Sequence, residues 1–318
     1  MKRKYGFVAV LLSVILLAGM GLTMLYTNSR EDQDNTKDLT VVTSFYPMYI
    51  AAMNVIGDTD GVTLRNLSEP KTGCLHDYQL TPEDMKLLSQ ADVFIVNGGG
   101  IESFLSDVAA SYPDLTIINA CEEISLIEEE TAHEAHDHED EEEEHDHGDV
   151  NAHAWMSVSA YKQQIDNIAE GLEKADTMHK ENYRINADAY RKALEPLEEE
   201  IKEFAKQAGG SRVVSFHEAY AYLAEETGLE ITYTLNLDEE RQISAGEVAE
   251  VVSQLQQEAS PVVLAEETYG KDMGNVVSQE AGAEVVYLDP LVTGEYDKDS
   301  YLNGMQKNIR LLKEAFTR

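Results

Sequence analysis

The chain has 318 residues, of which 60 are Asp or Glu and 24 are Lys or Arg, so its formal net charge is −36 at pH 7. This acidic excess argues against nucleic-acid binding, because phosphates would be repelled, and it favours solubility and the attraction of cations. Beyond an apolar N-terminal segment, about 280 residues remain, which is enough for two modest domains or one large one.

The first 30 residues indicate a membrane segment. Basic residues at positions 2–4 precede an apolar run at 7–26. A helix of about twenty residues, rising about 1.5 Å per residue, spans the roughly 30 Å apolar core of a bilayer. Positive charge at its start keeps the N-terminus inside and exports the body. We therefore expect residues 1–30 to anchor the protein on the outer face of a bacterial cell membrane. A cleaved signal peptide is the alternative, although no A-x-A-like site is evident.

Residues 31–38 are polar and aperiodic and predict a linker. The next part, 39–176, has the alternation of an α/β lobe. Thr81 and Pro82 make a good helix start, because Thr can cap the helix and Pro suits its first position. The tract 122–150 is acidic and His-rich, without Lys or Arg, and predicts a low-complexity loop that is disordered without metal. The predicted strands are 39–44, 62–67, 92–96 and 115–118, and the helices are 46–56, one from residue 81, and 101–110.

A long helical stretch follows, from 159 to about 207, with a break near 175–177 where Asp176 or Thr177 could cap the second part. That second helix, within 177–208, is about thirty residues long and could cross between two lobes. Gly209 and Gly210 end it.

The α/β alternation resumes over 209–318. Strands are predicted at 212–215, 230–234, 261–265 and 284–288, and helices at 218–227, 245–258, 273–281 and 300–316. The expected fold is α/β, with two similar lobes, each a mostly parallel sheet flanked by helices, joined by one long rigid helix. Ligands of such sheets bind at the carboxyl ends of the strands, so a cleft between the lobes is the expected site.

Three histidines fall where such a site belongs. His76 lies in the loop after the second strand, His153 lies just past the acidic tract, and His217 comes right after the strand 212–215 and Phe216. Three imidazoles and one oxygen form a sensible tetrahedral zinc site. Spacing alone leaves open the alternative that each is an ordinary polar residue satisfied by its neighbours.

A second group of histidines lies in the acidic tract among carboxylates. We expect it to bind metal weakly and to exchange it quickly, because ordering the loop costs entropy. A solvated acidic loop is the alternative. The hypothesis is that this loop raises the local zinc concentration near the main site. The histidines of this group are His133, His136, His138, His145 and His147.

The catalytic motifs of common hydrolases are absent. There is no G-x-S-x-G, H-E-x-x-H or P-loop, and the position where a zincin helix would need its second His is Ala221. There is no CxxC pair, and a disulfide between Cys74 and Cys121 is permitted if the protein is exported. We expect no enzyme activity; a secreted zinc-dependent hydrolase is kept as an alternative.

Several motifs resemble the solute-binding proteins of zinc and manganese ABC importers, the cluster A-I family. They are GCLHDYQLTPED at 73–84, ADVFIVNGGGIE at 91–102, NAHAWMS at 151–157 and VVSFHEAY at 213–220, in the family's order. The resemblance implies two α/β lobes with a metal ion between them, and little motion of the lobes. Many Gram-positive relatives are lipoproteins, and here Met20 stands in place of the anchoring Cys.

The resemblance also assigns the ligands. It makes His76, His153 and His217 metal ligands, and His at the third position is typical of the zinc subfamily, where manganese binders tend to have Glu. The stretch YLDPL at 287–291 matches the place of a fourth ligand, which makes Asp289 the candidate, with Glu295 or water as alternatives.

The function implied is capture of Zn²⁺ as transported ligand and its delivery to the membrane permease and ATPase of an ABC importer. We expect a monomer that also contacts the cytoplasmic membrane through residues 7–26. A manganese or iron carrier of the same fold is the alternative.

Overall fold

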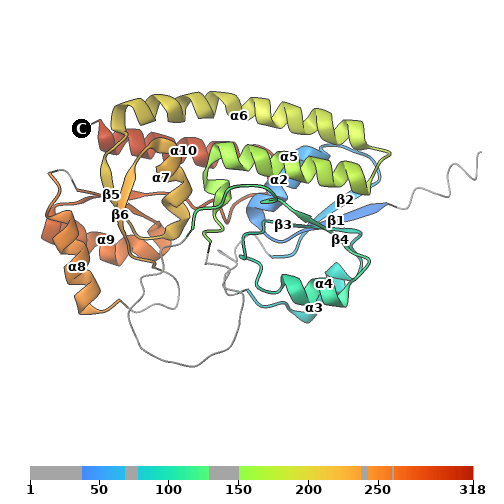
Figure 1. The fold of residues 1–318 in the computed structure, drawn as a ribbon, viewed down its shortest axis with the longest axis horizontal. Helices are drawn as coiled ribbons and strands as arrows, with labels where there is room; N and C mark the ends of the chain where they lie inside the picture. Colours follow the sequence, from blue (N-terminus) through green and yellow to red (C-terminus); the bar gives the residue numbers. More distant parts are fainter. Residues whose placement is uncertain (1–37, 69–77, 129–149, 238–242, 260, 318) are drawn as a thin grey trace, which may run out of the picture.

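The computed structural model describes residues 38–68, 78–128, 150–237, 243–259 and 261–317. It contains two parallel four-stranded sheets, each flanked by helices, with the helix α6 (Lys180–Ala208) lying along both (Figure 1). We call the sheet of β1–β4 with its flanking helices the N-terminal lobe, and the sheet of β5–β8 with its flanking helices the C-terminal lobe. This confirms the predicted fold class.

The N-terminal sheet has the strand order β2-β1-β3-β4, with all neighbours parallel. Its central strand β3 is buried on both faces, as expected for a strand covered by helices. Its elements in chain order are β1 (Leu39–Thr43), α2 (Tyr46–Ile56), β2 (Val62–Asn66), α3 (Pro82–Leu88), β3 (Val93–Val96), α4 (Leu105–Ser111) and β4 (Thr116–Asn119).

The two faces of this sheet follow the alternation of side chains along each strand. Val93 and Ile95 pack into the same hydrophobic cluster as α2 and α5 (Val158–Ala175). Phe94 and Val96 point to the opposite face and pack with residues of α3 and α4. Thr81 caps α3 as predicted, accepting a hydrogen bond from the backbone N–H of Asp84.

The C-terminal sheet repeats the arrangement with the order β6-β5-β7-β8. Along the chain, the elements of the two sheets are separated by the short 3-10 turn η1 (Ala154–Met156), followed by α5 and α6. The elements of the C-terminal lobe are β5 (Arg212–Ser215), η2 (Glu218–Tyr220), α7 (Ala221–Thr227), β6 (Glu230–Thr234), α8 (Ala245–Leu255), β7 (Val262–Ala265), α9 (Glu267–Ala281), β8 (Glu284–Tyr287) and α10 (Ser300–Phe316).

Two helices begin elsewhere than the sequence suggests. The helix expected at 101–110 starts only at Leu105, behind three consecutive glycines at 98–100 with positive φ. The helix expected at 273–281 starts already at Glu267, and its Gly270 and Gly274 lie against the sheet. A Cβ at Gly274 would come 2.5 Å from the Tyr287 hydroxyl, so these glycines permit close packing rather than ending the helix.

The turn between α5 and α6 also differs from expectation. The second helix begins at Lys180, with neither Asp176 nor Thr177 as its cap. Instead, the Asp176 carboxylate lies 2.7 Å from Nδ1 of His179 and accepts a 2.7 Å hydrogen bond from the Tyr183 hydroxyl. Asp176 therefore joins the end of α5 to the first turns of α6 without capping it.

One hydrophobic cluster runs through both lobes. It takes in residues of both sheets and the buried stripe of α6, where side chains recur at helical spacing. Members from the two sheets and α6 include Val41, Ile95, Val213, Leu264, Leu194, Leu197 and Ile201. The lobes are therefore joined by a shared core as well as by a helix.

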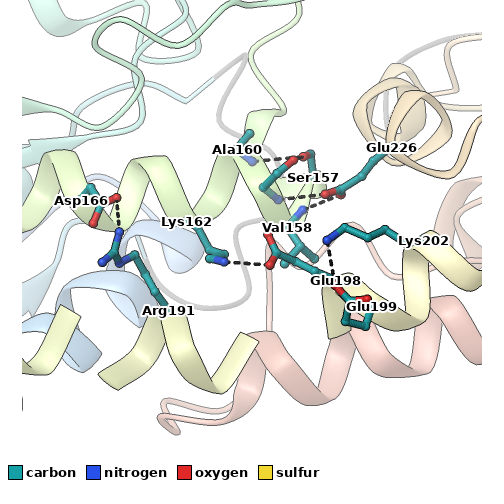
Figure 2. A network of polar contacts seen from close by, with 11 residues as sticks. Ser157, Val158, Ala160, Lys162, Asp166, Arg191, Glu198, Glu199, Lys202 and Glu226 are labelled. Atoms are coloured by element: carbon teal, nitrogen blue, oxygen red, sulfur yellow. Dashed lines mark hydrogen bonds and ion pairs between the residues drawn. The ribbon is translucent and has the colours of Figure 1, made fainter. Parts of the chain in front are cut away.

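Polar contacts reinforce this junction (Figure 2). The Glu226 carboxylate of α7 accepts hydrogen bonds from the backbone N–H groups of Val158 and Ser159, at 2.7 and 3.0 Å. A carboxylate at a helix N-terminus stabilises unpaired N–H groups and the helix dipole. Because α5 follows the His153 segment directly, this contact fixes that segment against the C-terminal lobe.

Candidate metal site

The structure brings two of the three predicted histidines together. The rings of His153 and His217 lie edge to face with their centroids 5.3 Å apart. His153 precedes η1, and His217 follows β5 after Phe216. His153 is fully buried, and the side chain of His217 is 14% exposed. Two imidazoles distant in sequence thus meet at the carboxyl end of β5.

Asn151 fixes the orientation of His153. Its Oδ1 lies 3.1 Å from Nδ1 of His153 and accepts a 3.0 Å hydrogen bond from the His153 backbone N–H. Its Nδ2 donates to the Glu218 carbonyl at 2.9 Å, which determines which way the amide faces. An amide oxygen only accepts, so the contact requires a proton on Nδ1 of His153. The Nε2 lone pair is then the one available to a metal.

The segment that carries His153 is also tied to the N-terminal sheet. Asn97, directly after β3, donates from Nδ2 to the Ala152 carbonyl at 2.9 Å. The buried Glu102 carboxylate accepts hydrogen bonds from the backbone N–H groups of Asn97 and Gly98. The ADVFIVNGGGIE motif thus forms the support beneath His153.

Glu266 is a residue near the histidines that the sequence reasoning missed. Its Oε2 lies 3.7 Å from Nδ1 of His217. Burial raises the pKa of Glu266 to about 6, with the charge of Asp289 adding to the rise and a hydrogen bond from Thr268 opposing it. Its position in the sequence could have indicated a role at the site, because Glu266, like His217, comes just after a central strand of the C-terminal sheet.

Asp289 follows β8 on a backbone fixed by Asn308. The Asp289 N–H donates to Oδ1 of Asn308, and Nδ2 of Asn308 donates to the Asp289 carbonyl. Its Oδ1 accepts a 2.8 Å hydrogen bond from the Leu291 N–H. Burial raises the pKa of Tyr220 well above its usual value, and the charges of Glu266 and Asp289 add to this rise.

The other candidates are placed differently. Glu295 is exposed, and its carbonyl accepts hydrogen bonds from Tyr46 and Ser300. Within the described ranges, no group of three His, Cys, Asp or Glu side chains is arranged to hold a metal ion. His76, Cys74 and the histidines at 133–147 lie outside the described residues.

Cys121 is a buried free cysteine whose Sγ lies 3.1 Å from Nε2 of Gln164. Burial raises the pKa of Cys121 to about 12, so it is a neutral thiol at pH 7 rather than a thiolate ligand.

Across the described part of the chain no helix is both long and apolar enough to cross a bilayer. The apolar run at 7–26 lies outside that part.

Two parallel sheets share a core, and two histidines meet at the carboxyl end of β5 in the C-terminal sheet. This arrangement is that of a metal-binding solute-binding protein. Residues 41–315 match the family described as "ZnuA: Zinc-uptake complex component A periplasmic". The chain belongs to this family, whose members are extracytoplasmic metal-binding proteins that serve the permease and ATPase of an ABC importer. They are not enzymes, so the hydrolase alternative is wrong.

Relatives with different metals match at similar levels. The high-affinity zinc uptake system protein ZnuA of Bacillus subtilis (strain 168) is 29% identical over 320 residues, covering 99% of this chain and 98% of that protein. The iron-binding protein YfeA of Yersinia pestis is 26% identical over 288 residues, covering 89% and 88%. Among solved structures, FpvC of Pseudomonas aeruginosa in complex with Ni²⁺ is similar with a TM-score of 0.74 and 26% identity, covering 88% and 97%.

Proposed function

We propose that the transported metal is Zn²⁺, bound between the lobes by His76, His153, His217 and Asp289. The observation that carries this is the 5.3 Å approach of the His153 and His217 rings. Imidazole nitrogen suits zinc well, whereas manganese favours oxygen ligands. The zinc uptake protein of Bacillus subtilis, similar over nearly its whole length, adds support.

A manganese or iron carrier is the second candidate. It is favoured by the similarity to the iron-binding YfeA and to the manganese-binding lipoprotein MntA of Halalkalibacterium halodurans, which is 25% identical. Glu266, whose Oε2 lies 3.7 Å from Nδ1 of His217, and the proposed ligand Asp289 offer the carboxylate oxygens that manganese prefers.

A competitive titration distinguishes the two candidates. The full-length chain in mild detergent is titrated with Zn²⁺ and Mn²⁺, beside a variant that combines His76→Ala, His153→Ala and His217→Ala. We expect one tight zinc site, far weaker manganese binding, and loss of the tight site in the variant. His179→Ala, a histidine at the start of α6, is the matched control and keeps the tight site. If the triple variant still binds zinc tightly, the tight site must be assigned to the His-rich loop instead.

The remaining parts of the proposal concern the membrane and the oligomeric state. Residues 7–26 hold the protein at the outer face of the cell membrane, and the protein is a monomer. Fractionation of cells and sedimentation of the detergent-solubilised chain test these two statements separately.

A further inference from the structure

His217 and Glu266 face each other because of strand register. Strands β5 and β7 are paired in parallel, with Ser215 opposite Leu264. The pairing continues as the Phe216 N–H donates to the Leu264 carbonyl at 2.8 Å. Two residues beyond the last paired position, His217 and Glu266 therefore leave neighbouring strands at the same level, both with extended backbone.

The side chain of Glu266 has no local structural task as a helix cap. Glu266 occupies the N-cap position of α9, but its side chain makes no capping hydrogen bond, and Glu is not a favoured N-cap residue. Only 17% of this side chain is exposed. A carboxylate so far removed from water is costly unless something nearby interacts with it. The Thr268 side chain donates a hydrogen bond to this carboxylate, and the nearest ring nitrogen is Nδ1 of His217, 3.7 Å from Oε2 of Glu266.

A carboxylate beside Nδ1 has a definite effect on an imidazole. It favours the tautomer with the proton on Nδ1, which leaves the Nε2 lone pair to bind a metal. A hydrogen bond from Nδ1–H to the carboxylate, once formed, also fixes the ring plane and raises the basicity of Nε2. Asn151 Oδ1 lies within hydrogen-bond distance of Nδ1 of His153, at 3.1 Å, and favours the same tautomer there, so both histidines would present Nε2.

We propose that Glu266 is a positioning residue, which holds His217 through Nδ1–H and so presents its Nε2 to the transported metal. The inference rests on the proposed function, in which His217 is a ligand. At 3.7 Å the two atoms are beyond hydrogen-bond distance, and metal binding at Nε2 is expected to draw them together, because a bound cation makes Nδ1–H a stronger donor.

The test compares zinc affinity in single and double variants of the full-length chain. Loss of an outer-shell partner typically weakens metal binding about 10- to 100-fold, and we expect this for Glu266→Ala. Glu266→Gln keeps an acceptor oxygen and should lose less. Glu267→Ala is the matched control, because Glu267 is the adjacent residue, with a side chain 74% exposed, and should bind zinc like the parent chain.

The double variant His217→Ala/Glu266→Ala separates positioning from general damage. If Glu266 acts through His217, removing it from a chain that already lacks His217 has no further effect, so the two losses are not additive. Fully additive losses would overturn the inference. A spectroscopic readout accompanies this: the zinc-loaded chain should show a slowly exchanging Nδ1–H proton of His217 in NMR spectra, kept in Glu266→Gln and lost in Glu266→Ala.

The outcomes distinguish this inference from the proposed function. If His217→Ala loses tight zinc while Glu266→Ala and Glu266→Gln do not, Glu266 is not a positioning residue and the zinc site stands. If His217→Ala keeps tight zinc, His217 is not a ligand, and both the proposed ligand set and the role of Glu266 are wrong.

Discussion

Trp155 donates its indole N–H to the backbone carbonyl of Pro290 at 2.9 Å. Trp155 lies two residues after His153, and Pro290 directly follows Asp289, so one buried hydrogen bond joins two proposed ligand segments from different lobes. The Tyr301 hydroxyl of α10 donates to the Trp155 carbonyl at 2.8 Å. Both contacts are made by protein groups alone, and they tie the backbone next to His153 to the backbone next to Asp289.

Trp155→Phe is therefore expected to lower both stability and metal retention. The change leaves the Pro290 carbonyl without its donor in a buried place, which costs about 1–3 kcal/mol in unfolding free energy. Urea unfolding of the metal-free chain and the zinc dissociation rate measure the two effects. An unchanged unfolding midpoint would show that the hydrogen bond contributes nothing to the junction.

Asn151→Ala is expected to weaken zinc binding about 10- to 100-fold, because His153 loses the acceptor that fixes its Nδ1 proton. The change also removes the hydrogen bond to the Glu218 carbonyl, so some stability is lost as well. Asn182→Ala, at an exposed position of α6, is the control and should change neither quantity. Equal zinc affinities of the two variants would contradict the role given to Asn151.

The turn between α5 and α6 predicts a pH-dependent contribution to stability. Burial of Asp176 opposes its ionisation, but hydrogen bonds from His179 and Tyr183 outweigh this and lower the pKa of Asp176 below 3.8. A lowered folded-state pKa means stability that is fully present above about pH 4 and is lost as the pH falls through the folded-state value.

Asp176→Asn should therefore reduce the unfolding free energy at pH 7 by about 1.5–3 kcal/mol, as for hydrogen bonds to a charged group. The difference from the parent chain should shrink below pH 4. Urea titrations at pH 7, 5 and 3 in the absence of metal measure it, and a difference that stays constant with pH would count against an ionised Asp176.

The shared core predicts little motion between the lobes. A hydrophobic cluster that includes Val41, Val213 and Leu197 would have to be disrupted for the lobes to swing apart. The hydrogen bond from the Val158 N–H, at the start of α5, to the Glu226 carboxylate of α7 opposes the same motion. Solution scattering with and without zinc should give nearly identical curves, and a clear compaction on zinc addition would contradict a rigid junction.

Deletion of residues 133–147 tests the role of the His-rich loop. We expect the tight zinc site to survive and the additional weak binding to disappear, because the proposed ligands lie elsewhere in the chain. Loading of the tight site should become slower at low zinc concentration, which stopped-flow competition with a chelator can follow. Loss of the tight site on deletion would mean that the loop is part of it.

Much of the architecture could be predicted because it depends on local patterns. The bounds of α2, β5, β6 and α10 agree with those expected from the sequence. Helix caps, glycine stops and the alternation of apolar residues act over a few neighbouring positions, so they are readable along the chain. The starts of α4, α6 and α9 differ from those predicted. For α9 the reason is that whether Gly270 interrupts a helix depends on what packs against it.

The two α/β halves, the long helix, the family motifs and the positions of His153 and His217 at the ends of elements can all be predicted from the order of residues along the chain. The folded arrangement was needed to show that these two rings meet, that Asn151 and Glu266 lie beside their Nδ1 atoms, and that one core runs through both lobes. The physical reason is range: periodicity and capping act between near neighbours in the chain, whereas Glu266 meets His217 only through the register of β5 and β7.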